Sequence, residues 1–154
     1  MTPNQFIDQY SKLASLGTLG TPIFPSVTMA QAIIESGWGK DPTATQANNF
    51  FGIKDSDKWN GPTIVLPTPN DSTPFSAFRK YIDASESFRD HINFFYDNAR
   101  YRSPSHNVFT APTPGEQCQA IAKAGYAEAP NYAATLITLI NQYDLKKLDK
   151  KKIT

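Results

Sequence analysis

The sequence predicts a mainly helical α+β domain with one small β-hairpin. Apolar residues recur at helical spacing in several segments, and three of those segments begin with a capping box. Two strand-like runs joined by a proline-rich turn lie between the second and the third predicted helix. At 154 residues the chain forms one domain on the usual prior of ~100 to 200 residues per domain. We place this domain at residues 1–145 and a basic tail at residues 146–154.

The first two helices are indicated by their boundaries. The segment Thr2-Pro3-Asn4-Gln5 is a capping box with proline at the first helical position, which predicts a helix over about residues 3–16. A stretch rich in glycine and proline breaks it, and Ser26 is the candidate N-cap of a second helix that Gly37 ends. One side of this second helix is apolar. The polar residues on its other side are Thr28, Gln31 and Glu35.

The middle of the chain predicts an ordered loop and then the hairpin. No hydrophobic period is sustained from Asp41 to Asn60, although this loop contains aromatic residues that must pack somewhere. The runs Thr63–Leu66 and Phe75–Tyr81 have the composition of strands, and prolines punctuate the segment between them. We therefore expect a β-hairpin with a proline-stiffened tip.

Three further helices follow the hairpin. Asp83 begins a capping box whose helix ends near Tyr101, and Thr113 begins another whose short helix stops at Gly125. The last helix follows Pro130 and carries an apolar stripe. No internal repeat of solenoid length is present, so the sequence does not indicate a repeat protein.

Composition and charge exclude several classes of function. Fifteen Lys and Arg residues against 14 Asp and Glu residues give a net charge of +1, which argues against DNA or RNA as a partner. No run approaches the ~18 consecutive apolar residues of a membrane span, and the N-terminus lacks the pattern of a signal peptide. We therefore expect no nucleic acid, no membrane span and no signal peptide in this chain. The lysines of the tail are typical of a solvated terminus, although such a run also suits a polyanion.

The sequence contains no motif for a metal or a nucleotide. His91 and His106 lack the spacing of metal ligands, and no phosphate-binding glycine loop or serine-hydrolase motif is present. We expect no metal and no cofactor. The single cysteine, Cys118, is followed at helical spacing by apolar residues and is expected to be a buried core thiol.

Glu35 is the candidate catalytic residue. It lies in the last turn of an otherwise apolar helix, directly before Ser36-Gly37-Trp38-Gly39. The negative end of the helix dipole and the loss of water beside Trp38 both disfavour a charged carboxylate, so we expect the pKa of Glu35 above the ~4.3 of a free Glu. A carboxyl that is protonated near neutral pH is the general acid that glycosidic bond cleavage requires. The competing interpretation is a solvated glutamate at a helix end.

Several segments along the chain resemble one enzyme family. In order they are Ala30–Gly39, Asn49–Lys54, Trp59–Pro62, Phe78–Tyr81, Arg100–Tyr101, Gly125–Ala127 and Asn131–Ala133. Together they resemble the β-N-acetylglucosaminidases of glycoside hydrolase family 73, over about Phe6 to Tyr143. That family digests peptidoglycan and includes the wall-digesting domain of the flagellar rod protein and several autolysins.

The resemblance implies a fold, an activity and a partner. The fold would be lysozyme-like, with a helical lobe and a β-lobe that flank a glycan groove. The activity would be that of an endo-β-N-acetylglucosaminidase that cleaves after GlcNAc in GlcNAc-β-1,4-MurNAc strands, with Glu35 as the general acid. The partner would be the glycan strands of peptidoglycan, so we expect a monomer that acts on the bacterial cell wall.

The second catalytic carboxylate is where the sequence departs from the family. In similar proteins the hairpin carries a second Glu, but counting forward from Trp59 without gaps reaches Asn70, and the hairpin contains no Glu. The nearest carboxylate is Asp71, for which the competing interpretation is a turn-forming role. Three alternatives stay open: Asp71 activates water as in inverting enzymes, the acetamido group of the substrate assists, or activity is weak.

Aromatic side chains supply the expected sugar-binding surface, because the apolar face of a pyranose stacks well on Tyr and Trp. Tyr126 and Tyr132 match family positions for substrate contact, although Tyr132 also begins the apolar stripe of the last helix. Arg79 is expected to pair with a hairpin carboxylate or to be a surface charge. The weaker candidates for substrate binding are Trp59, Phe51 and Lys54. Core packing is the competing interpretation for Phe51 and for Trp38.

Two other classes of function stay open. A muramidase or a lytic transglycosylase also uses one Glu at a helix end, and a transglycosylase needs no second carboxylate. A non-catalytic wall-binding module would keep the groove without a base. The biological setting is open between a phage or prophage lysin, a secretion-system component and a catalytic domain cut from a longer exported chain.

Overall fold

The computed structural model describes residues 1–68 and 73–151 of the chain. Its helices are α1 (Pro3–Thr18), α2 (Pro25–Ser36), α3 (Pro42–Ala47), α4 (Ala84–Asp97), α5 (Pro114–Lys123) and α6 (Tyr132–Gln142), with the 3₁₀ helices η1 (Ala99–Tyr101) and η2 (Leu145–Lys151). Its strands are β1 (Thr63–Pro67), β2 (Phe75–Arg79), β3 (Arg102–Ser103) and β4 (His106–Asn107). The predicted α+β class, mainly helical with a small hairpin, is confirmed. Among the helices described, none combines the length and the hydrophobicity that crossing a membrane requires.

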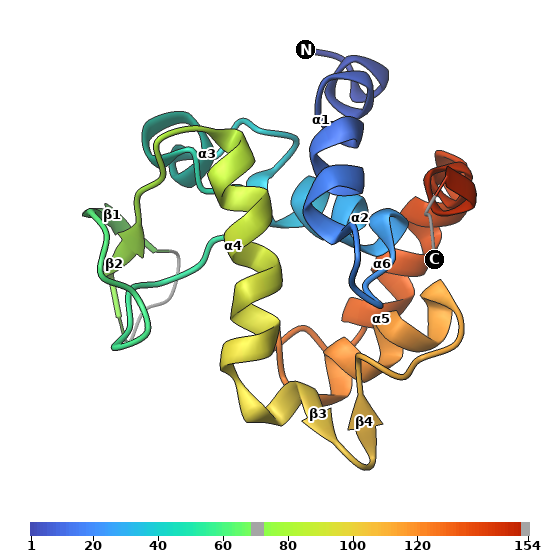
Figure 1. The fold of residues 1–154 in the computed structure, drawn as a ribbon. Helices are drawn as coiled ribbons and strands as arrows, with labels where there is room; N and C mark the ends of the chain where they lie inside the picture. The colour runs from blue at the N-terminus through green and yellow to red at the C-terminus, as the bar shows by residue number, and fades with distance from the viewer. Residues whose placement is uncertain (69–72, 152–154) are drawn as a thin grey trace.

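Helix α4 stands between a small β-lobe and a larger helical lobe (Figure 1). The hairpin and α3 lie on one side of α4, and α1, α2, α5 and α6 lie on the other. Helix α3 contacts both strands of the hairpin, whereas α2 contacts α1, α5, α6 and η2. The β-lobe is therefore a two-stranded ladder supported by one short helix, and α2 is the central helix of the larger lobe.

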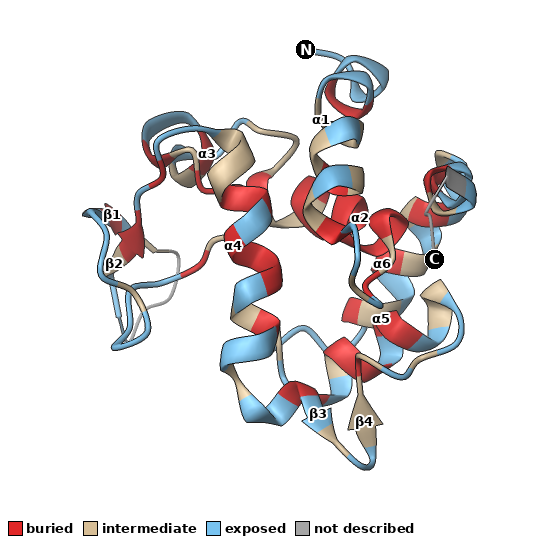
Figure 2. Ribbon diagram, in the orientation of Figure 1, coloured by how far each residue is buried: buried red, intermediate tan, exposed pale blue. Residues whose placement is uncertain are grey.

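Helix α2 is buried along nearly its whole length (Figure 2). Of the residues in Pro25–Ser36, only Ile34 and Glu35 are not fully buried. Gly37 ends the helix as predicted, in the left-handed conformation with a φ of 55°. The C-terminal turn is thus the part of this core helix that reaches an accessible surface.

The C-terminal 3₁₀ helix η2 packs on the helical lobe. Leu145 and Leu148 are buried, so the predicted basic tail begins within packed structure and not only in solvent. The carboxylate of Asp149 accepts hydrogen bonds from the backbone N–H and the hydroxyl of Ser26. The prediction of Ser26 as the N-cap of α2 was wrong, because Phe24 is the N-cap and Ser26 lies inside the helix.

The other helices begin where the capping boxes predict, but α4 ends at Asp97 and not near Tyr101, because a separate 3₁₀ helix follows it. The side chain of Thr2 accepts from the N–H of Gln5, and that of Gln5 accepts from the N–H of Thr2, so both bonds of the first box are present. Asp83 and Thr113 each accept from the N–H three residues further on. The predicted burial of Cys118 is also confirmed, and burial raises the pKa of its thiol to about 12.

The β-lobe contains both expected and unexpected elements. The hairpin is antiparallel, with Ile64 opposite Phe78, and its strands agree with the predicted runs to within two residues. Helix α3 was not predicted, because its six residues are too few to show a hydrophobic period within the expected loop. The two-residue ladder of β3 and β4, in the helical lobe, was not predicted either.

Candidate active site

Glu35 lies where α2 ends and is half-buried. Burial raises the pKa of its carboxyl, a hydrogen bond from Tyr132 lowers it, and the charge of Asp41 raises it further. The net direction is upward, as the sequence predicted. Glu35 is therefore a carboxyl biased toward its protonated form at the exposed end of a core helix.

Two cavities meet at Glu35. One measures about 510 Å³ and extends toward the hairpin, and the other measures about 350 Å³ and extends toward α4. Glu35 and Gly52 line both cavities. The φ of Gly52 is 63°, and a Cβ built there would lie 3.9 Å from Oε2 of Glu35. Glycine at this position therefore suits the backbone and keeps the space in front of Oε2 open.

Tyr132 holds the other oxygen of the Glu35 carboxyl. Its hydroxyl donates to Oε1 of Glu35 at 3.0 Å, while its ring is buried. The sequence left Tyr132 between a core role and a groove role; its ring packs in the core, it lines neither cavity at Glu35, and its hydroxyl reaches the carboxyl. The ring of Tyr126 stacks against that of Tyr132 with a centroid separation of 5.9 Å and an interplanar angle of 12°.

Tyr126 lines the second cavity and carries an unsatisfied polar atom. Its hydroxyl is buried, and among the residues described it has no hydrogen-bond partner. Burial raises the pKa of this hydroxyl, so it stays protonated. A phenol that is neutral and unpaired at the edge of a cavity retains a donor and an acceptor for a ligand.

Behind Tyr132, a line of buried side chains joined by hydrogen bonds runs through Gln31 to His91. The amide nitrogen of Gln31 donates to the Tyr132 hydroxyl at 3.1 Å, and the amide oxygen of Gln31 lies 2.9 Å from Nε2 of His91. Both side chains are fully buried. Burial lowers the pKa of His91 to about 3, so its ring is neutral near neutral pH. The sequence showed only that this histidine lacks metal-ligand spacing, and nothing in it indicated the connection.

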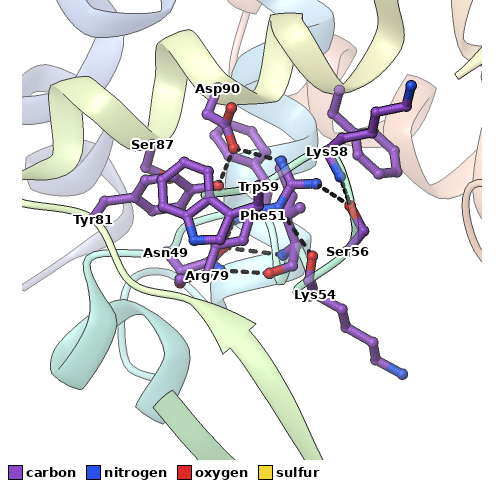
Figure 3. A network of polar contacts seen from close by, with 12 residues as sticks. Asn49, Phe51, Lys54, Ser56, Lys58, Trp59, Arg79, Tyr81, Ser87 and Asp90 are labelled. Atoms are coloured by element: carbon purple, nitrogen blue, oxygen red, sulfur yellow. Dashed lines mark hydrogen bonds and ion pairs between the residues drawn. The ribbon is translucent and has the colours of Figure 1, made fainter. Parts of the chain in front are cut away.

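Arg79 attaches the β-lobe to α4 (Figure 3). Its guanidinium forms an ion pair with Asp90 at 2.9 Å and donates to the carbonyl of Lys54 at 3.0 Å and the hydroxyl of Ser56 at 2.9 Å. The ring of Trp59 covers it at 5.5 Å. The expectation of a hairpin partner or a surface charge was wrong, because Arg79 is only 2% exposed and its partner lies on α4. This contact fixes one wall of the second cavity.

The structure brings some of the predicted binding residues together and separates others. Phe51, Lys54 and Tyr126 line the second cavity with Glu35. Trp59 lines neither cavity at Glu35, because its ring packs edge-on against Tyr81 and over the guanidinium of Arg79. Asp71 lies outside the described residues.

Two aromatic residues near the motif pack in the core. The ring of Phe51 stacks on that of His91 with a centroid separation of 3.9 Å and is 2% exposed, which favours core packing over a sugar contact. The indole of Trp38 packs against Phe6 and Tyr143 and lines neither cavity at Glu35. Burial raises the pKa of Glu35 as expected, and these contacts give no support to Trp38 as its source.

Asp41 is the charged group that sequence reasoning missed. It precedes α3, is exposed and lines the first cavity together with Glu35. Although it occupies the N-cap position of α3, its side chain makes no capping hydrogen bond. The signal in the sequence was an Asp-Pro pair soon after Gly37, which is typical of a helix start.

Comparisons with known proteins agree with this geometry. The family model named Glucosaminidase, described as mannosyl-glycoprotein endo-β-N-acetylglucosaminidase, matches residues 15–145. The exo-glucosaminidase LytG of Bacillus subtilis is 33% identical over 151 residues, which cover 94% of this chain and 53% of LytG. The peptidoglycan hydrolase FlgJ of Escherichia coli K12 is 32% identical over 146 residues, covering 89% of this chain and 45% of FlgJ. The chain thus spans about half the length of these curated relatives.

Solved structures agree as well. The catalytic domain of the autolysin Auto from Listeria monocytogenes superposes with a TM-score of 0.78 at 30% identity, covering 97% of this chain and 90% of that domain. The glycoside hydrolase domain of FlgJ from Salmonella typhimurium gives a TM-score of 0.74 at 29% identity, covering 96% and 91%. The lysozyme-like fold that the resemblance implied is confirmed.

Proposed function

Because this chain belongs to the glucosaminidase family, we propose that it is a peptidoglycan hydrolase that cleaves GlcNAc-β-1,4-MurNAc bonds with Glu35 as the general acid. One observation carries the proposal: a half-buried carboxyl with a raised pKa lies where two cavities meet. A wall glycan is the favoured substrate because relatives are named peptidoglycan hydrolase and autolysin.

The environment of Glu35 suits the chemistry of glycoside cleavage. The leaving oxygen must receive a proton as the sugar develops oxocarbenium character, and a carboxyl kept protonated by burial supplies it. Burial and the charge of Asp41 both favour the protonated form of Glu35. The opposing hydrogen bond from Tyr132 keeps the carboxyl oriented. These partners favour the protonated form of the carboxyl and hold its orientation.

The two cavities support cleavage within a strand. In this proposal sugars on either side of the scissile bond occupy the two cavities, with Glu35 between them. The relative LytG is named an exo-glucosaminidase, so release of single sugars from a chain end is the second candidate. The length of the first products decides between them, because internal cleavage gives long fragments before short ones.

Tyr126 and Tyr132 are the proposed substrate-contacting residues, with Lys54 at the edge of the second cavity. The unpaired hydroxyl of Tyr126 is suited to hydrogen-bond an acetamido group or a sugar hydroxyl. Tyr132 acts chiefly through its bond to Glu35. The roles of Trp59 and Phe51 in binding lose support because their rings pack against other side chains.

Asp71 is the proposed second carboxylate, acting as the base for water in an inverting reaction. Support comes from the residues on the β1 side of the hairpin tip, since Leu66, Pro67 and Thr68 line the first cavity. The alternative is assistance by the acetamido group of the substrate, which needs no second carboxylate. The variant Asp71→Asn distinguishes the two. It is expected to abolish cleavage if Asp71 is the base, and to leave most of the activity if the acetamido group assists.

The proposed setting is the bacterial cell wall, on which the chain acts as a monomer. A phage lysin, a secretion-system component and the catalytic domain of a longer exported protein all fit that setting. The competing activities are those of a muramidase or a lytic transglycosylase. A wall-binding module without activity is a further alternative, against which the intact surroundings of Glu35 argue.

The test is to digest purified peptidoglycan, reduce the products and identify the new chain ends by mass spectrometry. The proposal expects reduced GlcNAc ends. MurNAc ends would indicate a muramidase, and anhydro-MurNAc ends a lytic transglycosylase. Binding without any release of fragments would indicate the non-catalytic module.

A further inference from the structure

The hydroxyl of Tyr132 has a single proton. Whether its O–H bond points toward Glu35 decides which oxygen of the carboxyl can carry the acid proton. If that proton points to Oε1 of Glu35, it stabilises the carboxylate at that oxygen and leaves Oε2 to take up the acid proton. If it points the other way, Oε1 must itself carry a proton to keep the contact. The buried groups behind Tyr132 decide between these two arrangements.

The direction follows from one unsatisfied atom of His91. Nδ1 of His91 is buried and has no hydrogen-bond partner among the residues described. The neutral ring carries one N–H, and a buried N–H without an acceptor costs more than a bare ring nitrogen in the same place. The proton of the ring therefore lies on Nε2, which donates to the amide oxygen of Gln31 at 2.9 Å.

The donor and acceptor of the remaining hydrogen bonds, from Gln31 through Tyr132 to Glu35, can then be assigned in only one way. Because the amide oxygen of Gln31 accepts from His91, its NH₂ group faces Tyr132 and donates to the hydroxyl oxygen at 3.1 Å. That donor occupies the side of the hydroxyl turned toward Gln31, so the Tyr132 proton is directed to Oε1 of Glu35 at 3.0 Å. Each group in the line donates toward the carboxyl.

We propose that Gln31 and His91 are positioning residues that aim the Tyr132 hydroxyl at the catalytic carboxyl and so leave its Oε2 to carry the acid proton. Oε2 is the oxygen in front of Gly52, which lines both cavities. The inference rests on the proposed function for its catalytic meaning, but the orientation itself is a property of the free protein.

The charged and titratable groups around the line do not compete with it. On the groove side, Glu35 faces Asp41 from the segment before α3, and the second cavity adds Lys54, Asp55 and Arg79. The aromatic rings beside His91 are those of Phe51, Phe95 and Tyr126. The titratable groups near Tyr132 in the interior are Tyr126 and Cys118, and burial raises the pKa of both. Burial is the cause of the low pKa of His91, so within residues 1–68 and 73–151 no neighbouring charge shifts this end of the line, and the ring stays neutral.

The test measures the pKa of Glu35 directly in the free protein, by ¹³C NMR of the side-chain carboxyl in protein labelled at glutamate. Assignment is simple because the glutamates of the chain are Glu35, Glu86, Glu116 and Glu128. His91→Phe keeps an aromatic ring between its neighbours but removes the donor. His91→Gln loses the ring but retains an amide N–H near the position of Nε2.

The expected results separate orientation from packing. In His91→Phe the pKa of Glu35 rises by about half a pH unit or more, because the bond from Tyr132 is less firmly directed. In His91→Gln it stays near the wild-type value. The rise disappears in the Tyr132→Phe background, since the line then no longer reaches Glu35. Gln31→Met replaces His91→Phe if that variant does not fold, with the same expected rise.

An unchanged Glu35 pKa in a folded His91→Phe or Gln31→Met protein would overturn the inference. So would an equal rise in His91→Gln, or a rise that persists in the Tyr132→Phe background. Because no glycan is present in this titration, failure of the wild-type protein to cleave peptidoglycan would refute the proposed function alone. With an active protein, the alkaline limb of the pH–rate profile is expected to move upward together with the pKa.

Discussion

The hydroxyl of Tyr132 donates to Oε1 of Glu35 at 3.0 Å across 97 positions of sequence. The contact exists because α6 packs on α2, which brings the first residue of α6 to the last turn of α2. It connects the core of the helical lobe to the place where the two cavities meet.

Tyr132→Phe is expected to raise the pKa of Glu35. The lost hydrogen bond stabilises the charged form, so its removal favours the protonated form by about one pH unit. A general acid acts while protonated, so activity falls as pH rises through its pKa. The alkaline limb of kcat/KM therefore moves to higher pH, while activity at the optimum falls because the carboxyl is less firmly oriented. A limb that moves to lower pH would contradict this account.

Asp41→Asn is expected to have the opposite effect. The charge of Asp41 raises the pKa of Glu35, so neutralising it lowers that pKa and moves the alkaline limb to lower pH. The shift is below about one pH unit, because Asp41 is exposed and solvent screens its charge. Repeating the profiles at high salt provides the control, since the difference between the two proteins is expected to shrink as salt increases.

Asp90→Asn is expected to destabilise the fold. The change leaves the buried guanidinium of Arg79 without its carboxylate, and breaking such a pair costs about 3 to 5 kcal/mol. Urea unfolding at neutral pH measures the loss in the free energy of unfolding. Arg89→Met, at an exposed position of the same helix, is the matched control and is expected to change it by less than about 0.5 kcal/mol.

Gly52→Ala is expected to lower the rate of cleavage while the protein stays folded. A left-handed φ of 63° costs a non-glycine residue about 1 to 2 kcal/mol, and the added Cβ lies 3.9 Å from Oε2 of Glu35. If Glu35 acts as proposed, the methyl group occupies space that the leaving oxygen needs. Gly115→Ala has a comparable Cβ contact, with Ile137, and no left-handed φ, so it serves as the control. Equal activity in the two variants would show that the space before Oε2 is not used.

Much of the fold was predictable because local signals agreed with packing. The capping residues Thr2, Asp83 and Thr113 each begin a helix, and Gly37 ends one. The misplaced N-cap at Ser26 shows the limit of such signals. Its hydroxyl bonds a carboxylate 123 positions away, and a proline before it starts the helix instead.

The site was predictable only where local sequence carries it. Glu35 stands out because it interrupts an apolar helix just before glycines. The groups that shift its pKa come from other elements: Tyr132 lies on α6 and Asp41 precedes α3. Arg79 illustrates the same limit, because pairing with Asp90 depends on how the hairpin docks on α4. Such long-range contacts leave no periodic signal in one sequence.

The role of Glu35 as the general acid is tested by comparing Glu35→Gln with Glu128→Gln. Glu128 is an exposed glutamate outside both cavities at Glu35, so its variant controls for the loss of one carboxyl. Both are assayed for release of reduced GlcNAc ends from purified peptidoglycan, with folding checked by thermal unfolding. Glu35→Gln is expected to lose activity by at least about 100-fold while it stays folded, and Glu128→Gln is expected to cleave like the wild-type protein. Cleavage by a folded Glu35→Gln protein at the wild-type rate would contradict the assignment of Glu35 as the general acid.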